Sequence, residues 1–494
     1  MRRTVLLVAL CLLLAGCAAL APGDPEAETS TTETIGEPAG SANETVDTDT
    51  TEYTDGLSLP EDRTNPTNAT IGWYNGYWYD DPVSVNTTGG LNGTERDAVA
   101  ARSKARVEVI RGLPFEEHVS IDVISREEFR DRQPDSGETT TLDEIRYEAM
   151  FIIGGEGSVA EQRERTHGQT VGGFYSVGRG SIVLVSETDT PRVDVETLAH
   201  ELTHALQDQH FDLSGTMAAE THDQSQARLG LIEGDANAVM YAYGDRCGDF
   251  WTCLEYPDED GTDGDQPDIH MGLYLDSFFP YSSGPSFVET LRDGNDWTAV
   301  NGAYDAPPNA SREIITPGEY GTFVPADVAI GDRDTGEWER VRQPGRPDHE
   351  VVGRAGMSVM FAYTVYHDEN PDTLVAPTDL LNMVDGDVDR THPLNYDLDM
   401  TQGWAGDRLQ AYERGDETAY VWRIAWDSTD DVERFVDAYT ELLEYWGGEQ
   451  TGDGTWTFDE RSEFAGDLQI TTDGNTVTIV SAPTRDSLSA VTPT

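Results

Sequence analysis

The stretch Ala199-His-Glu-Leu-Thr-His-Ala-Leu206 contains the pattern His-Glu-x-x-His. On an α-helix, residues four positions apart lie on the same face, so His200 and His204 can bind one Zn²⁺ ion. Glu201 is offset by about 100° around the helix. It therefore lies beside the metal, which suits a base that takes a proton from a water molecule activated by zinc. The alternative is a pair of ordinary histidines on a helix face, so the rest of the chain must supply the context.

The helix that carries this pattern has two possible starts. Thr190 can be the N-cap with Pro191 at the first helical position, or Asp194 can cap a later start. An apolar stripe predicts that one face of the helix packs against the core; it consists of Leu198, Leu202, Ala205 and Leu206. The two histidines flank this stripe, where we expect the core to meet a cleft.

A catalytic zinc ion needs three protein ligands and an open position for water, and two residues compete to be the third ligand. His210 follows His204 by six residues, but Gln207 stands where the corresponding motif has a helix-breaking glycine. On a continuous helix, His210 is about 240° around from His204 and cannot reach the metal. Glu233 lies in a second predicted helix, residues 220–243, which can present a carboxylate to the open side of the histidine pair.

At these residues the chain resembles the gluzincin branch of zinc metallopeptidases, in which a glutamate on a downstream helix is the third ligand. The resemblance implies that His200, His204 and Glu233 hold Zn²⁺ and that Glu201 is the general base. It also implies a zincin-like core in which a mixed sheet with an edge hairpin accompanies the active-site helix and the glutamate helix.

The residues around the predicted ligands depart from the gluzincin pattern. Thermolysin-like gluzincins have an aspartate four residues after the third ligand, where this chain has Asn237. An asparagine can still accept a hydrogen bond from an imidazole N–H. Asp235 is a second candidate for a histidine partner, and Asp223 is a third. The donor that stabilises the oxyanion is expected to be a tyrosine, and the candidates are Tyr281, Tyr241 and Tyr243.

A narrower resemblance extends from about Thr94 to the C-terminus. Over this length the chain is similar to a family of zincin-like surface lipoproteins of haloarchaea, with relatives among secreted bacterial proteins. The stretches that carry the likeness begin at His200, Leu231, Pro280, Pro307 and Gly403, and they read HELTHALQDQHF, LIEGDA, PYSSGPSF, PPNAS and GWAGDR.

The chain of 494 residues is strongly acidic, with 93 acidic residues, 32 basic residues and a formal net charge of −61. Lys104 is its one lysine. Such a charge repels itself unless salt screens it, so we expect a high-salt environment. The composition provides no basic patch to neutralise phosphates and therefore argues against a nucleic-acid partner.

The N-terminus has the pattern of an export signal. A basic start and a short apolar run lead to Leu14-Ala-Gly-Cys17, so residues 1–16 are predicted to be a signal peptide. The last four residues resemble the lipobox of prokaryotic lipoproteins, which implies cleavage before Cys17 and a lipid on its sulfur. Arg2-Arg3 also resembles a twin-arginine signal. An ordinary signal peptide is the alternative. The lipid would anchor the exported protein to the outer face of the cytoplasmic membrane, at the cell surface.

Residues 17–70 are rich in Thr, Asp, Glu, Gly and Pro and are predicted to form a disordered tether. Five sites fit the N-glycosylation pattern, namely Asn43, Asn68, Asn86, Asn92 and Asn309. Cys247 and Cys253 are predicted to form a short-loop disulfide outside the cell; two unrelated buried thiols are the alternative.

The remaining patterns predict an α+β fold. Residues 71–345 are expected to form the zincin-like catalytic domain, including a β-hairpin over 173–176 and 181–186 directly before the zinc helix. The edge of this hairpin can receive an extended peptide, or the hairpin can simply complete a sheet. Residues 346–494 are expected to form a helical and α+β region with strands over 408–412, 418–426, 456–458, 467–471 and 476–480.

Together these patterns predict an exported, lipid-anchored zinc metallopeptidase that acts on peptides or proteins. Two alternatives remain open. One is a non-catalytic zincin-fold protein that binds the cell envelope or another protein. The other is a zinc-dependent hydrolase of a non-peptide amide.

Overall fold

The computed structural model describes Pro66 and residues 70–492, except 133–138, 156, 187, 189, 257–268, 293, 295, 332–336, 344 and 368–372. The predicted signal peptide, Cys17, Asn43 and Asn68 lie outside the described residues. The fold is of the α+β class, as predicted. Among the described helices, none is both long enough and apolar enough to cross a membrane.

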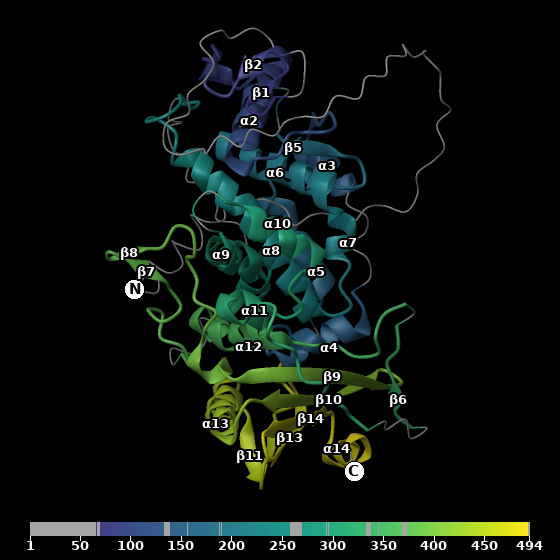
Figure 1. The fold of residues 1–494 in the computed structure, drawn as a ribbon. Helices are drawn as coiled ribbons and strands as arrows, with labels where there is room; N and C mark the ends of the chain where they lie inside the picture. The colour runs from purple at the N-terminus through teal and green to yellow at the C-terminus, as the bar shows by residue number, and fades with distance from the viewer. Residues whose placement is uncertain are drawn as a thin grey trace.

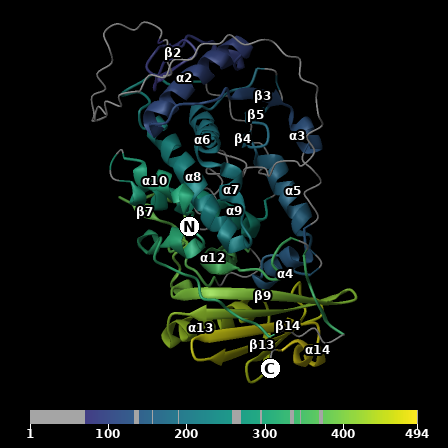
Figure 2. The same cartoon turned by 45° about the vertical axis from the view of Figure 1, so that its right-hand side comes forward.

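Helices form the middle of the molecule (Figure 1). The longer ones are α2 (Gly93–Arg111), α5 (Val159–Thr170), α6 (Val195–Phe211), α8 (His222–Gly244), α9 (Met271–Leu291), α12 (Gly353–Ala362) and α13 (Thr429–Tyr445). The shorter ones are α3 (Arg126–Arg132), α4 (Thr141–Ala149), α7 (Leu213–Met217), α10 (Thr298–Asp305), α11 (Ser311–Ile315) and α14 (Arg485–Val491). Helix α8 packs against α9 and α6 (Figure 2).

A three-stranded sheet lies at one end of this helical layer (Figure 1). Its order is β3 (Ser120–Ile124), β5 (Ser181–Val185), β4 (Gly173–Ser176). The predicted hairpin is present, but the strand that directly precedes α6 is β5, which lies in the centre because it also pairs in parallel with β3. The two edge strands are β3 and β4, and β4 packs against α6 and is tied to it by a hydrogen bond from the Tyr175 hydroxyl to Asp208.

A seven-stranded sheet lies at the other end (Figure 1). Its order is β11 (Glu449–Gly452), β12 (Thr455–Phe458), β13 (Gly466–Asp473), β14 (Thr476–Ala482), β10 (Glu417–Trp426), β9 (Trp404–Arg414), β6 (Glu339–Arg340). Helices α4, α12 and α13 pack against the face of this sheet that carries Trp422, whereas α14 packs against the opposite face, which carries Val421. The strands from β9 onward confirm the C-terminal elements predicted from the sequence. Two small hairpins complete the fold: β1 (Trp73–Tyr74) with β2 (Tyr77–Trp78), and β7 (Met383–Val384) with β8 (Asp387–Val388).

The hydrophobic core crosses the expected boundary at residue 345. Strand β6 precedes this boundary but belongs to the C-terminal sheet, and α12 follows it but packs against α8, α9 and α11. One cluster of buried side chains includes Leu202 of α6, Phe279 of α9, Val359 of α12 and Trp422 of β10. The two predicted regions therefore share one core.

Two helices cover less of the chain than the apolar residues around them. Apolar residues continue to Ile153, but helix α4 ends at Ala149, because Phe151 adopts a left-handed backbone (φ 54°) and inserts its ring among aromatic residues that include Trp446 and Phe464. Helix α12 starts only at Gly353, because Glu350 before it pairs with β9.

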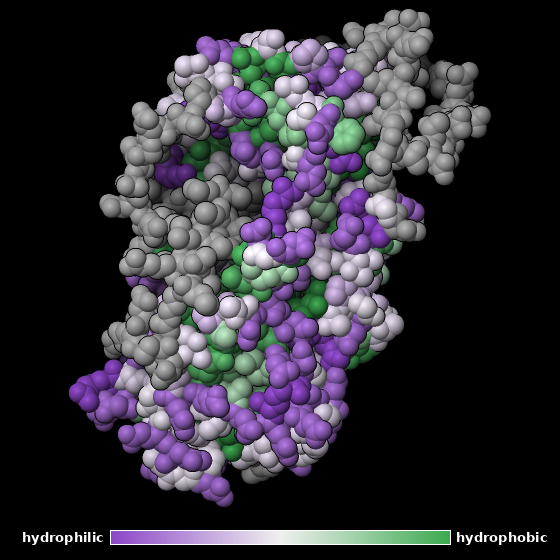
Figure 3. Space-filling model, turned by 90° about the vertical axis from the view of Figure 1, so that its left-hand side faces the viewer, coloured by the Kyte–Doolittle hydropathy of each residue, from purple (hydrophilic) through white to green (hydrophobic). Residues whose placement is uncertain are grey.

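The acidic chain can fold around this core because most of its described surface is hydrophilic. On the face drawn in Figure 3, hydrophilic residues cover much of the described surface and hydrophobic ones form small groups between them. Large exposed hydrophobic side chains among the described residues are few: Phe250, Val324, Met383 and Val384. The carboxylates thus mostly meet solvent, and the buried ones need specific partners.

Candidate metal centre

Helix α6 starts at the later of the two predicted positions. Asp194 is the N-cap, and its side chain accepts a hydrogen bond from the backbone N–H of Thr197 at 2.7 Å. The predicted apolar stripe is buried, as expected for the core-facing side of an amphipathic helix. This packing fixes the rotation of α6 about its axis and directs His200 and His204 toward α8.

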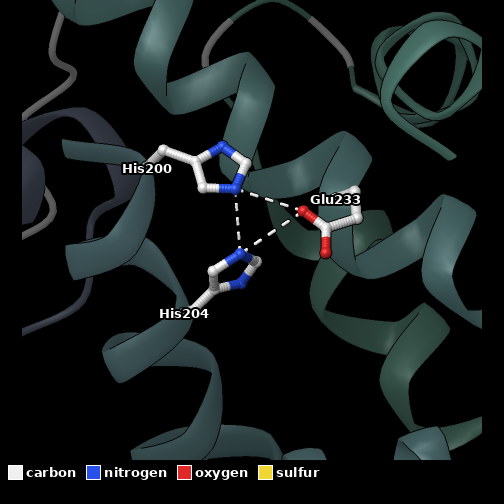
Figure 4. A group of neighbouring side chains, drawn as sticks. All are labelled: His200, His204 and Glu233. Atoms are coloured by element: carbon white, nitrogen blue, oxygen red, sulfur yellow. Dashed lines mark hydrogen bonds and ion pairs between the residues drawn. The ribbon is translucent and has the colours of Figure 1, made fainter. Parts of the chain in front are cut away.

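Helix α8 lies close to α9 because glycines line their contact. A Cβ atom on Gly234 would lie 2.3 Å from the carbonyl oxygen of Gly284, and one on Gly284 would lie 2.3 Å from the carbonyl oxygen of Gly230. Side chains on α8 can therefore reach both α6 and the backbone of α9. Glu233, between these glycines in sequence, points toward the two histidines (Figure 4).

The three predicted ligands converge (Figure 4). His200 Nε2 lies 2.9 Å from His204 Nε2, and Glu233 Oε2 lies 3.1 Å from the first nitrogen and 3.4 Å from the second. Ligand atoms around a tetrahedral zinc ion, each 2.0–2.1 Å from the metal, are about 3.3–3.4 Å apart. The observed triangle is therefore close in size to one face of a zinc tetrahedron.

Two side-chain amides fix which ring nitrogens face inward. Asn237 Nδ2 donates to the Tyr281 carbonyl at 3.1 Å, so its Oδ1 faces His200 Nδ1 at 2.9 Å. Gln207 Nε2 donates to the Ile232 carbonyl at 2.9 Å, so its Oε1 faces His204 Nδ1 at 2.8 Å.

A backbone carbonyl can only accept a hydrogen bond, so neither amide can be reversed without loss. Each Nδ1 therefore carries a hydrogen, and each Nε2 offers its lone pair to the centre of the triangle. The three inward atoms are all acceptors, and they are stable so close together only around a cation. This donor set, two imidazole nitrogens and a carboxylate oxygen, is one that Zn²⁺ prefers.

The pKa values of His204 and Glu233 show that a proton competes with a metal ion for the centre of the triangle. Burial alone would lower the pKa of His204, but the Glu233 carboxylate outweighs burial and raises it to about 9. Burial alone would raise the pKa of Glu233, but His204 and His200 outweigh it and lower the value to about 2. A proton on His204 and a divalent ion are thus alternative occupants.

Glu201 adds an unpaired carboxylate beside this triangle. Its side chain is fully buried, and neither of its oxygens accepts a hydrogen bond from any described residue. A buried carboxylate without partners costs several kcal/mol, so a structural role is a poor explanation for this residue. Its position one residue after His200 is the one expected for a general base.

The other residues considered in the sequence analysis lie elsewhere. Asp235 does not contact a histidine, which corrects that expectation; it binds Arg111 through both carboxylate oxygens and accepts from Tyr304. Residues two apart on a helix are separated by about 200°, so Asp235 cannot share a face with Glu233. Asp223 accepts from Ser311, ten residues before Glu233 along α8. His210 lies outside the triangle, and its Nε2 donates to the Pro114 carbonyl at 2.8 Å.

Tyr281 lies next to the candidate centre. Its ring stacks on that of His200, with centroids 6.1 Å apart and an interplanar angle of 19°. Tyr243 instead directs its hydroxyl to Ser103 and Arg106 on α2, away from the triangle. The role of Tyr281 as an oxyanion donor stays a prediction.

Gln207 belongs to the candidate centre, although the sequence pattern does not predict it. In the sequence it stands where the related motif has a glycine. Its spacing of three residues from His204 was the available signal, because side chains three apart on a helix are neighbours. Its side-chain amide is the hydrogen-bond partner of the second histidine, His204.

The described glycosylation candidates are on the surface, and the two cysteines are half-buried. Cys247 and Cys253 are joined by a disulfide. Asn86, Asn92 and Asn309 are exposed. The Asn92 side chain caps α2 and its Nδ2 donates to Glu95, so attachment of a glycan there would compete with the cap.

Comparison with known proteins informs only the C-terminal part. A family model described as a domain of unknown function (DUF8575) matches residues 339–492, which span the seven-stranded sheet from β6 to α14. No curated protein and no solved structure matches the chain. The matched residues do not include the candidate metal ligands.

Proposed function

We propose that the protein is a zinc metallopeptidase of the gluzincin type with a zincin-like core. The observation that carries the proposal is the convergence of three acceptor atoms, from His200, His204 and Glu233, whose outward nitrogens are held by amides. Three protein ligands leave one position for water or substrate, which is the arrangement of catalytic rather than structural zinc sites.

The chain's own residues have distinct roles in this proposal. His200, His204 and Glu233 would hold Zn²⁺, and the metal, when bound, polarises a carbonyl and lowers the pKa of water to about 7. Glu201 would take a proton from the attacking water and deliver it to the leaving amine. Burial of Glu201 strengthens its electrostatic interactions with the reacting groups.

An extended peptide is the substrate that the neighbouring strand suits. Among the described strands, β4 pairs only with β5, and it packs against α6. Peptides add to such edges through main-chain hydrogen bonds. The N-terminal sequence supports the further proposal that the enzyme is exported and held at the cell surface by a lipid on Cys17, in a high-salt environment.

One observation favours a second candidate function. His200, Glu201, His204 and Glu233 are each at most 1% exposed. Peptide hydrolysis therefore requires the residues over the site to move, whereas a non-catalytic zincin-fold protein, which binds the cell envelope or another protein, could use the same metal to stabilise its fold without opening.

Hydrolysis measurements separate the two candidates. Purified protein in high salt should cleave casein or a quenched peptide library, and Glu201→Gln should lower the rate at least 10²-fold, the usual contribution of a general base, while it retains zinc. Wild type that binds zinc but cleaves no peptide would contradict the peptidase and support the non-catalytic protein. A parallel screen of non-peptide amides tests the remaining alternative, a hydrolase of an envelope amide.

A further inference from the structure

Helix α9 continues through two prolines, Pro280 and Pro285. Proline has no N–H, so each one removes the hydrogen bond that a helix makes to the carbonyl four residues earlier. The two carbonyls that lose a partner are those of Asp276 and Tyr281. Backbone carbonyls inside a fold need partners, so each of these two can accept from a donor other than the missing N–H.

Side-chain amides of α8 supply both partners. Gln226 Nε2 donates to the Asp276 carbonyl at 2.6 Å, and Asn237 Nδ2 donates to the Tyr281 carbonyl at 3.1 Å. The contacts between glycines of α8 and α9 bring the two backbones close enough for these short side chains to reach. The two prolines thus create a matched pair of sites, and only one of them adjoins the metal ligands.

We propose that Pro285 is a positioning residue for the metal centre. Because the Pro285 nitrogen has no hydrogen to donate to the Tyr281 carbonyl, that carbonyl accepts from Asn237 Nδ2, and the amide is oriented with Nδ2 toward α9 and Oδ1 toward His200. Oδ1 then keeps the hydrogen of His200 on Nδ1 and leaves the Nε2 lone pair directed at Glu233 and the metal. The proposal rests on the zinc centre proposed above but not on peptide hydrolysis.

The same geometry accounts for asparagine at position 237. An aspartate could accept from His200 but could not donate to the Tyr281 carbonyl, and its charge would lie against that carbonyl oxygen. Asparagine has both groups and satisfies both neighbours. In this chain the amide is therefore better suited than a carboxylate, because a proline stands four residues after Tyr281.

The test compares Pro285→Ala with Pro280→Ala as the matched control. Alanine at 285 restores an N–H that bonds to the Tyr281 carbonyl and releases the Asn237 amide. We expect Zn²⁺ affinity, measured by chelator competition in high salt, to fall about 10–100-fold, the usual effect of losing a partner of a ligating histidine. Pro280→Ala should leave the affinity nearly unchanged. Nitrogen-15 NMR of the metal-free variants should show the Nδ1–H tautomer of His200 preserved in Pro280→Ala and mixed with the Nε2–H form in Pro285→Ala.

A second substitution tests the role of the Asn237 amide while α9 keeps both of its prolines. Asn237→Asp should weaken zinc binding, although a carboxylate partner usually strengthens a ligating imidazole, and adding Pro285→Ala to it should restore part of the affinity. Equal affinities in the two proline variants, an unchanged His200 tautomer, or tighter binding by Asn237→Asp would overturn the proposal. Failure to cleave peptides would count against the peptidase but would leave these readouts unaffected.

Discussion

At the scale of single residues, the direction of two amides decides what the histidines can bind. Asn237 and Gln207 each donate to a backbone carbonyl and accept from an imidazole Nδ1. Helical spacing predicted His200 and His204, because residues one turn apart share a face, and Glu233 was predicted from the second helix and the resemblance to gluzincins. It did not predict Gln207, because its second partner, the Ile232 carbonyl, belongs to another helix and is 25 residues away along the chain.

Substitution of Gln207 should change metal affinity more than stability. Gln207→Leu removes the acceptor for His204 Nδ1 and frees that ring to rotate or change tautomer. We expect Zn²⁺ affinity to fall about 10–100-fold. Gln207→Glu keeps the acceptor but cannot donate to the Ile232 carbonyl, so its affinity should lie between those of the wild type and Gln207→Leu. Chelator competition gives the affinities, and equal binding by all three proteins would contradict the role assigned to Gln207.

At the scale of elements, α9 is the longest described helix that sequence reasoning did not find. Two internal prolines argue against a helix, and the amides that satisfy the freed carbonyls come from α8, which no local pattern of α9 reveals. The amphipathic helices α6 and α13, in contrast, follow from their own periodicity and caps. Helices that are stabilised by their own periodicity and caps were predictable from the sequence. A helix such as α9, whose backbone carbonyls are bound by side chains of a neighbouring helix, was not.

Asp276 joins α9 to two other helices and should control stability in acid. It accepts from Tyr147 on α4 at 2.7 Å and lies 3.0 Å from His222 Nε2 on α8. Although burial raises its pKa, His222 and Arg146 outweigh burial and hold the pKa well below its usual range. A lowered folded pKa gives stability that is present above the unfolded pKa, about 3.9, and is lost as pH falls through the folded value.

Asp276→Asn should therefore destabilise the protein by about 3–5 kcal/mol at neutral pH, because it breaks a buried ion pair with Arg146 and leaves that cation with Asp143 as its remaining ion-pair partner. The difference from wild type should shrink as the pH falls below about 4. Denaturant unfolding at several pH values measures this. The exposed residue Asp416 provides a control, since Asp416→Asn should change stability by less than about 0.5 kcal/mol at any pH. A pH-independent difference for Asp276→Asn would contradict the assignment.

At the scale of the whole molecule, the formal charge of −61 has to be screened. The Debye length falls from about 10 Å at 0.1 M salt to about 3 Å at 1 M, so repulsion among surface carboxylates weakens strongly over this range. We expect the melting temperature, followed by circular dichroism, to rise steadily from 0.1 M to 1 M KCl. Sucrose at matched viscosity is the control for a non-ionic effect. A melting temperature that falls or stays constant with salt would show that the charge does not limit stability.

The central claim is that His200, His204 and Glu233 form a zinc centre. Equilibrium dialysis of the purified protein against limiting Zn²⁺ in high salt, with metal counted by mass spectrometry, tests it most directly. One zinc ion should be retained per chain by the wild type and by Glu201→Gln, and the ion should be lost from Glu233→Ala. A wild type that retains no zinc, or a Glu233→Ala variant that retains as much as the wild type, would contradict the claim.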